Sequence, residues 1–202
     1  CRGQALSVAV TGASGLVGSA LVSFLTTGGH RVLRLVRGEG IGSDVARWDP
    51  EHGSVPQAAL DGIDAVVHLA GENITSGRWT PEQKRRILES RTRGTRVLAE
   101  GLASLHNPPR VLVVASAIGF YGDRGDETLD ETSAAGTGFL AEVCRAWEGA
   151  TDVLATRGTR VVHLRLGVVL TPAGGALARM LPAARLGLGG PLGPGTQWTS
   201  WI

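Results

Sequence analysis

Three glycines spaced three residues apart, Gly12, Gly15 and Gly18, follow a short apolar run near the start of the chain. The run, residues 6–11, has the length of a buried strand, and residues 15–27 have the spacing of a helix. Glycines let the backbone turn sharply and approach a bound group, and a helix N-terminus offers free N–H groups and a partial positive charge. This stretch therefore predicts a loop that binds phosphate groups, with a simple tight turn as the alternative.

Arg37 is a second candidate, because it stands at the end of the next apolar run, residues 32–36. In dinucleotide-binding folds an acidic residue near this strand end binds the ribose 2′-hydroxyl of NAD, whereas an arginine favours the 2′-phosphate of NADP. Here the first carboxylate after the strand is Glu39. A charge-assisted contact contributes about 1.5–3 kcal/mol. The sequence therefore predicts NADP(H) rather than NAD(H), unless Arg37 is only a solvated side chain.

A long helix is predicted over residues 81–105. Thr80 can cap it, Pro81 occupies the first helical position and Gln83 completes a capping box. Arg91 lies on the apolar stripe of this helix, in line with Leu88. A guanidinium that faces a sheet keeps its charge and needs an anionic or carbonyl partner there. Arg91 is therefore expected to meet a ligand or the backbone.

The elements that must position these residues form an alternating pattern. Apolar runs at 6–11, 32–36, 45–48, 65–69, 111–115 and 161–166 are separated by segments of helical period, the last of them at 139–155. Strands that are apolar on both faces, with helices between them, imply an α/β fold with a parallel sheet covered on both sides. No linker interrupts residues 3–170, so we expect one domain there. After residue 170 the pattern loosens, and residues 187–195 predict no regular structure.

Composition excludes several classes of protein. Of the 202 residues 43% are hydrophobic, which rules out disorder, and 20 basic against 18 acidic side chains leave too small a net charge, +2, for binding nucleic acid by bulk charge. No apolar run approaches the roughly 20 residues of a membrane helix. The two cysteines, Cys1 and Cys144, favour a reducing compartment, so a cytoplasmic protein is expected. The acidic stretch 123–131 lacks the His or Cys spacing of a transition-metal site and is expected to be an exposed loop.

Several motifs together resemble a known family. The Thr-Gly-x-x-Gly-x-x-Gly loop at 11–18, Asp-Ala-Val-Val-His-Leu-Ala-Gly at 64–71 and Ser-Ala-Ile-Gly-Phe-Tyr-Gly at 116–122 resemble the extended short-chain dehydrogenase/reductases. Leu-Ala-Gly-Glu-Asn-Ile at 69–74, Trp147-Glu148 and Leu-Gly-Leu-Gly-Gly-Pro at 186–191 resemble more closely the atypical "epimerase family" branch. The resemblance implies a Rossmann-like doubly wound sheet in the order 3-2-1-4-5-6 and NADP(H) as cofactor.

The resemblance also assigns the cofactor-binding positions. It places the glycine loop under the pyrophosphate, Arg37 on the 2′-phosphate, the end of the fourth strand beside the riboses, Arg91 close to the cofactor, and the end of the sixth strand under the nicotinamide. The residues so assigned are Gly12, Ser14, Gly15, Leu16, Val17, Gly18, Arg37, Leu69, Ala70, Gly71, Arg91, Arg165, Gly167 and Val168.

The catalytic pattern departs from the family. Active members use a Tyr-x-x-x-Lys pair, whose lysine helps the phenol exchange a proton as hydride moves. Aligning Trp147-Glu148 on the family's helix puts Leu140 at the tyrosine position and Cys144 at the lysine position. The remaining catalytic candidates are Ser116, as a hydrogen-bonding group, and Tyr121, as a proton donor. For Tyr121 simple packing is the alternative, and Cys144 is expected to be a small buried hydrophobic residue.

Together these features predict an NADP(H)-binding, epimerase-family protein of oxidoreductase type that acts on a small carbonyl, hydroxyl or nucleotide-sugar-like compound. The alternative is a non-catalytic module that senses NADPH or is stabilised by the dinucleotide. We expect a small-molecule substrate as partner, neither nucleic acid nor a membrane, and a homodimer is compatible with the sequence. The resemblance implies that the segment 197–202 continues into a small substrate-capping region, so residues 171–202 are expected to begin that region, cut short at Ile202. Without an initiator Met, the chain is expected to be cut at its front as well.

Overall fold

A single parallel sheet forms the centre of the molecule. The computed structural model describes residues 4–38, 40, 42–74, 77–190, 193, 195 and 197–202; Cys1, Glu39 and Pro191, used above, lie outside them. The six strands of the sheet lie in the order β3-β2-β1-β4-β5-β6, which confirms the predicted order. They are β1 (Ser7–Thr11), β2 (Arg31–Val36), β3 (Val45–Arg47), β4 (Ala65–His68), β5 (Val111–Ala117) and β6 (Arg160–Leu166).

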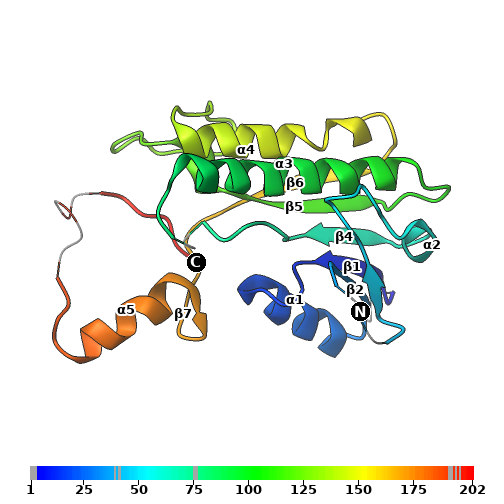
Figure 1. Cartoon of the computed structure of the whole chain (residues 1–202), viewed down its shortest axis with the longest axis horizontal. Helices are drawn as coiled ribbons and strands as arrows, with labels where there is room; N and C mark the ends of the chain where they lie inside the picture. Colours follow the sequence, from blue (N-terminus) through cyan, green and yellow to red (C-terminus); the bar gives the residue numbers. More distant parts are fainter. Residues whose placement is uncertain are drawn as a thin grey trace.

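Helices cover the sheet from two sides. The strand order runs outward from β1 in one direction and from β4 in the other, so right-handed crossovers put α1 (Leu16–Thr27) on one face and α3 (Pro81–Ala103) with α4 (Phe139–Gly149) on the other. Figure 1 shows α3 and α4 side by side, away from α1. The short α2 (Gln57–Leu60) precedes β4, and the single-turn helices η1 (Ile118–Tyr121) and η2 (Asp152–Leu154) follow β5 and α4.

The core lies between the sheet and α3. Leu98 and Leu102 of α3 are fully buried against Val66 of β4 and Leu112 of β5. The helix begins as predicted, because the Thr80 hydroxyl accepts a hydrogen bond from the Gln83 N–H at 3.2 Å. The predicted long helix is therefore confirmed, with its end at Ala103.

One prediction about a helix is wrong: the helix predicted over 139–155 ends at Gly149, and the chain continues through η2. Residues 170–186, for which the sequence analysis named no element, contain β7 (Leu170–Thr171) and α5 (Gly175–Arg185). No residue of α5 is buried. Leu177, Met180, Leu181 and Ala184 have helical spacing, and its Ala, Leu, Arg and Met residues favour helix by intrinsic propensity, but Pro182 lies inside the helix and obscures the pattern.

The C-terminal residues return to the edge of the fold beside the end of β6. The Val168 N–H donates to the Ser200 carbonyl at 2.9 Å, and the Ile202 N–H donates to the Val168 carbonyl at 3.1 Å. A Cβ on Gly167 would lie 2.7 Å from the Ser200 oxygen, so only glycine allows this approach. In the described part of the chain, no helix has the length and apolar character required to cross a membrane.

Candidate functional site

The glycine loop packs backbone against backbone where β1, α1 and β4 meet. Gly12 has a φ of +67°, and a Cβ on it would lie 2.8 Å from the Leu69 carbonyl carbon and 2.9 Å from the Ala70 nitrogen. A Cβ on Gly18 would lie 2.1 Å from the Gly12 oxygen. Neither position accepts a larger residue without a backbone shift. The predicted loop is thus a tightly fitted cradle at the point where the strand order reverses, which is the ligand crevice of open α/β sheets.

The first turn of α1 is open to a ligand. Gly15 caps the helix without any side-chain hydrogen bond, and its N–H donates to the Gly12 carbonyl at 2.9 Å. Ser14, Gly15 and Val17 are exposed, whereas Leu16 is half-buried. Backbone N–H groups at an uncapped helix N-terminus suit a phosphate.

Thr11 ties the ends of β1 and β4 together. Its Oγ1 accepts hydrogen bonds from the N–H groups of Leu69, at 3.1 Å, and Ala70, at 3.2 Å. Its own proton therefore goes to Nδ1 of His68, 2.7 Å away. It follows that His68 is neutral with its hydrogen on Nε2, a buried atom without a hydrogen-bond partner among the described residues. This Thr11–His68 pair fixes the floor of the crevice.

His68 makes stability depend on pH. Burial lowers the pKa of His68 from 6.5 to about 4, so the unfolded chain binds a proton at a pH where the folded chain does not. The free energy of unfolding is expected to fall as the pH drops from about 6.5 to about 4, by up to roughly 3 kcal/mol. Urea unfolding over this range measures the loss, and His68→Gln should remove this part of the slope. The exposed His106→Gln is the control, and an unchanged slope in His68→Gln would contradict the assignment.

Arg37 lies at the end of β2, beyond Val36, and is exposed. Within the described residues it makes no hydrogen bond or ion pair. Its guanidinium is therefore available to an added anion, and its contact with the 2′-phosphate stays a prediction.

Arg91 faces the end of β4. A Cβ on Gly71 would lie 3.5 Å from its Cζ, and the guanidinium carbon lies 5.0 Å from the Trp147 ring centroid. Its Nη1 donates to the Ile87 carbonyl at 3.3 Å. Burial lowers the pKa of Arg91, and it has no ion pair in the described part of the chain. The carbonyl that it meets belongs to its own helix, one turn back, and most of the guanidinium's donors remain for a ligand on the sheet side.

A polar network joins the ends of β5 and β6. Arg165 Nε and Nη2 donate to the two carboxylate oxygens of Glu148 at 3.0 and 2.9 Å, and Ser116 Oγ donates to the same carboxylate at 2.7 Å. Arg165 Nη1 donates to the Tyr121 hydroxyl at 3.0 Å. Both catalytic candidates, Ser116 and Tyr121, thus belong to one network centred on the Glu148–Arg165 ion pair.

Glu148 stays ionised in this network. Burial raises its pKa, but the hydrogen bonds from Arg165 and Ser116 outweigh burial and lower it; the bond to Glu148 in turn raises the pKa of Arg165. Sequence reasoning used Glu148 only as part of a motif and assigned it no role. The signal was its spacing, because Leu140, Cys144 and Glu148 repeat every four residues and share one face of α4.

The two positions that replace the family's Tyr-Lys pair carry no proton relay. Cys144 is 3% exposed with its Sγ 3.7 Å from the Ala117 carbonyl oxygen, and burial raises the pKa of the thiol. Leu140 is half-buried, and its Cβ would lie 3.3 Å from a Cβ on Gly119. Cys144 is a small buried residue, as predicted.

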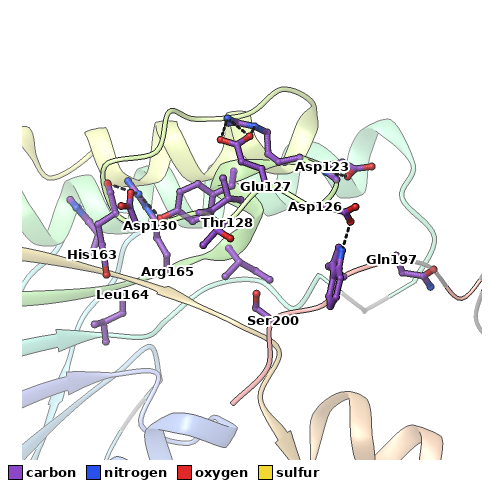
Figure 2. Close-up of a pocket in the computed structure, with 18 residues that line it drawn as sticks. Asp123, Asp126, Glu127, Thr128, Asp130, His163, Leu164, Arg165, Gln197 and Ser200 are labelled. Atoms are coloured by element: carbon purple, nitrogen blue, oxygen red, sulfur yellow. Dashed lines mark hydrogen bonds and ion pairs between the residues drawn. The ribbon is translucent and has the colours of Figure 1, made fainter.

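A large open cleft, of about 1400 Å³, lies beside the network. Figure 2 shows the acidic loop over Arg165 and His163, with Ser200 on the other side. The Trp198 indole N–H donates to Asp126 Oδ1 at 2.6 Å. The cleft is lined by Tyr121, Arg165, Trp198 and Ser200 together with the carboxylates Asp123, Asp126, Glu127, Asp130 and Glu131. The acidic stretch is exposed, as predicted, and no group of His, Cys, Asp or Glu suited to a metal occurs among the described residues.

The predicted cofactor residues fall into two groups. The loop, Arg37, Leu69, Ala70, Gly71 and Arg91 gather around the crevice at the ends of β1, β2 and β4. Gly167 and Val168 instead pack against the C-terminal residues. The N–H groups of Arg165 donate to Glu148 and Tyr121. These three therefore lie at the ligand side of β6 with their own protein partners.

A six-stranded parallel sheet with a glycine cradle at its reversal point defines a dinucleotide-binding α/β protein. The chain belongs to the NAD dependent epimerase/dehydratase family, whose model matches residues 8–202. This confirms the resemblance to the epimerases seen in the sequence.

Individual relatives support the same assignment. Epimerase family protein Mb2239 of Mycobacterium bovis is 46% identical over 195 residues, which cover 96% of this chain and 64% of the relative. The crystal structure of human epimerase family protein SDR39U1 with NADPH matches with a TM-score of 0.87 and 35% identity, covering 98% of this chain and 65% of that one. A nucleoside-diphosphate sugar epimerase from Corynebacterium glutamicum matches with a TM-score of 0.86 and 45% identity, covering 99% and 41%. The chain therefore spans less than two thirds of the length of these relatives.

Proposed function

We propose that this protein binds NADP(H) in the crevice between β1 and β4 and performs oxidoreductase or epimerase-type chemistry on a small carbonyl or hydroxyl compound. The observation that carries the proposal is the fitted glycine cradle, in which Gly12 and Gly18 leave no room for a Cβ. The backbone N–H groups at the start of α1 hold the pyrophosphate. The human relative solved with NADPH supports the same cofactor.

Two arginines complete the anion binding. Arg37 binds the 2′-phosphate from the end of β2, and Arg91 offers its unused N–H groups to the cofactor from the end of β4. Leu69, Ala70 and Gly71 line the riboses between them. When bound, the dinucleotide supplies or accepts a hydride.

The substrate side is formed by the cleft next to the network. Tyr121 and Arg165 lie on its wall, and Ser116 is tied to them through Glu148. A small carbonyl or hydroxyl compound or a nucleotide-sugar-like compound is the proposed class. Acid–base work is assigned to the side chains of this network. We also propose that a homodimer forms, which light scattering tests.

A second candidate function is a binding module that senses NADPH without catalysing a reaction. The observation in its favour is the pair Leu140 and Cys144, neither of which can relay a proton. Oxidation of NADPH in the presence of small aldehydes and ketones, followed by absorbance, separates the two functions. Turnover with any of them contradicts the sensing module.

Cofactor choice is tested with Arg37→Asp. The variant is expected to bind NADPH roughly 10- to 100-fold more weakly, because it loses a charge-assisted contact and gains repulsion, while NADH binding changes little. Isothermal titration calorimetry measures both. Arg31→Asp, at the opposite end of β2, is the matched control and should leave both affinities unchanged. Equal affinity of the wild-type protein for the two dinucleotides would contradict the role of Arg37.

A further inference from the structure

In the network beside the cleft, the phenol proton of Tyr121 has no acceptor among the described residues. Arginine has only donors, so in the bond between Arg165 Nη1 and the Tyr121 hydroxyl the phenol oxygen accepts. The phenol O–H makes no hydrogen bond to any group in the described part of the chain. Tyr121 is only 9% exposed, but it lines the cleft, so the cleft is the side toward which its proton can be donated. Ser116 differs, because it donates its proton to Glu148 at 2.7 Å.

Arg165 is held rigidly against the phenol. Two parallel bonds to Glu148 fix one side of the guanidinium, and its carbon lies 3.5 Å from the centroid of the Phe120 ring. The side chains of Arg165 and Glu148 are only 20% and 13% exposed. A bidentate pair of this kind fixes orientation as well as charge, and water screens it poorly. The positive charge therefore stays beside the Tyr121 oxygen.

We propose that Tyr121 is the proton donor of this site and that Arg165, oriented by Glu148 and Ser116, is the residue that stabilises the phenolate. The pair comes from η1 and β6 and does the work for which Leu140 and Cys144 on α4 are unsuited. This inference rests on the proposed function, and it adds to it the residue that moves the proton.

The step balances as a carbonyl reduction. The O–H bond of Tyr121 breaks, and the proton passes to the carbonyl oxygen of the substrate. The carbonyl carbon accepts a hydride, with its electron pair, from the reduced dinucleotide, which is oxidised. The phenolate that remains is neutralised by Arg165 and takes a proton back from water. The reverse direction oxidises an alcohol with the same groups.

The single tyrosine of the chain allows a direct test without a substrate. Tetranitromethane nitrates tyrosine through the phenolate, so the nitration rate of Tyr121, followed by peptide mass analysis, reports how well the site stabilises that form. Arg165→Gln is expected to slow nitration about tenfold, because the neighbouring positive charge is lost. Glu148→Gln is expected to speed it at least about twofold, because a negative charge is lost while Arg165 remains.

The two variants distinguish charge from structure. Both break the same ion pair, so a purely structural role predicts the same direction, faster nitration through loosening. Arg124→Gln, which removes an arginine of the same cleft that bonds to Glu127 and not to Tyr121, is the matched control and should change the rate less than twofold. Circular dichroism checks folding. If Arg165→Gln does not fold, Arg165→Met, which keeps the stem over Phe120, replaces it.

Opposite shifts in the two variants support the proposal. The proposal is overturned if the nitration rate changes in the same direction in both variants, if it does not change, or if Tyr121 of the wild-type protein is not nitrated. NADPH binding is measured on the wild-type protein separately. Opposite shifts without NADPH binding contradict the proposed function alone, whereas NADPH binding without opposite shifts contradicts the role of Tyr121 and Arg165 alone.

Discussion

Gly18→Ala is expected to abolish measurable NADPH binding and to destabilise the fold. The added methyl group would lie 2.1 Å from the backbone oxygen of Gly12 and 2.9 Å from its carbonyl carbon, and neither atom can move without displacing the loop. We expect a loss of about 2–3 kcal/mol in stability and a drop of roughly 100-fold or more in NADPH affinity, because misplaced N–H groups no longer meet the pyrophosphate. Urea unfolding and calorimetry measure the two losses.

Gly190→Ala is the control for this substitution. Among the described residues beyond its chain neighbours, no atom lies within 4 Å of a Cβ at Gly190, and its φ is outside the left-handed region. The control therefore changes the entropy of the chain without a clash, and both measurements should stay near wild type. A Gly18→Ala protein that binds NADPH as tightly as the control would show that α1 can withdraw from the loop at little cost.

Glu148→Ala is expected to lower stability by about 3 kcal/mol. It leaves the guanidinium of Arg165 largely buried without its carboxylate and deprives Ser116 of its acceptor, and an uncompensated buried charge is costly. For a domain of this size the melting temperature should fall by roughly 6–12 °C, which calorimetry or circular dichroism measures.

The comparison for Glu148→Ala is Glu127→Ala. Glu127 also pairs with an arginine, Arg124, at 2.7 Å, but its side chain is 48% exposed. Exposed ion pairs contribute about 0–1 kcal/mol, so its melting temperature should fall by no more than roughly 4 °C. Similar decreases of the melting temperature in the two variants would contradict the view that burial makes the Glu148–Arg165 pair important for stability.

The strands and the first phosphate-binding elements could be predicted because their signals are local. The apolar runs that became β1 and β2 and the glycine spacing at 12–18 each determine their own backbone geometry. The C-terminal helix α5 was not predicted, because Pro182 interrupts its helical pattern of apolar residues. It also begins at Gly175, directly after Gly174, and a pair of glycines is typical of a turn.

The candidate site was predicted in part. Arg91 could be assigned a partner because a charge on an apolar stripe is itself a signal. Glu148 could not be assigned a role, because its partners Ser116 and Arg165 are 32 and 17 residues away in sequence and meet it only when β5, β6 and α4 come together. Nor could sequence show that the Ser116 hydroxyl donates its hydrogen bond to that carboxylate, which leaves Tyr121 as the available proton donor.

The Thr11–His68 pair has a consequence for how the crevice opens. The Thr11 hydroxyl holds three groups at once, since it accepts from the N–H groups of Leu69 and Ala70 and donates to His68. Moving the end of β4 away by a small distance breaks all three bonds together and leaves buried polar groups without hydrogen-bond partners. The crevice floor should therefore behave as an all-or-none unit. In hydrogen exchange, the Leu69 and Ala70 amides are expected to exchange only through global unfolding, together with the centre of the sheet.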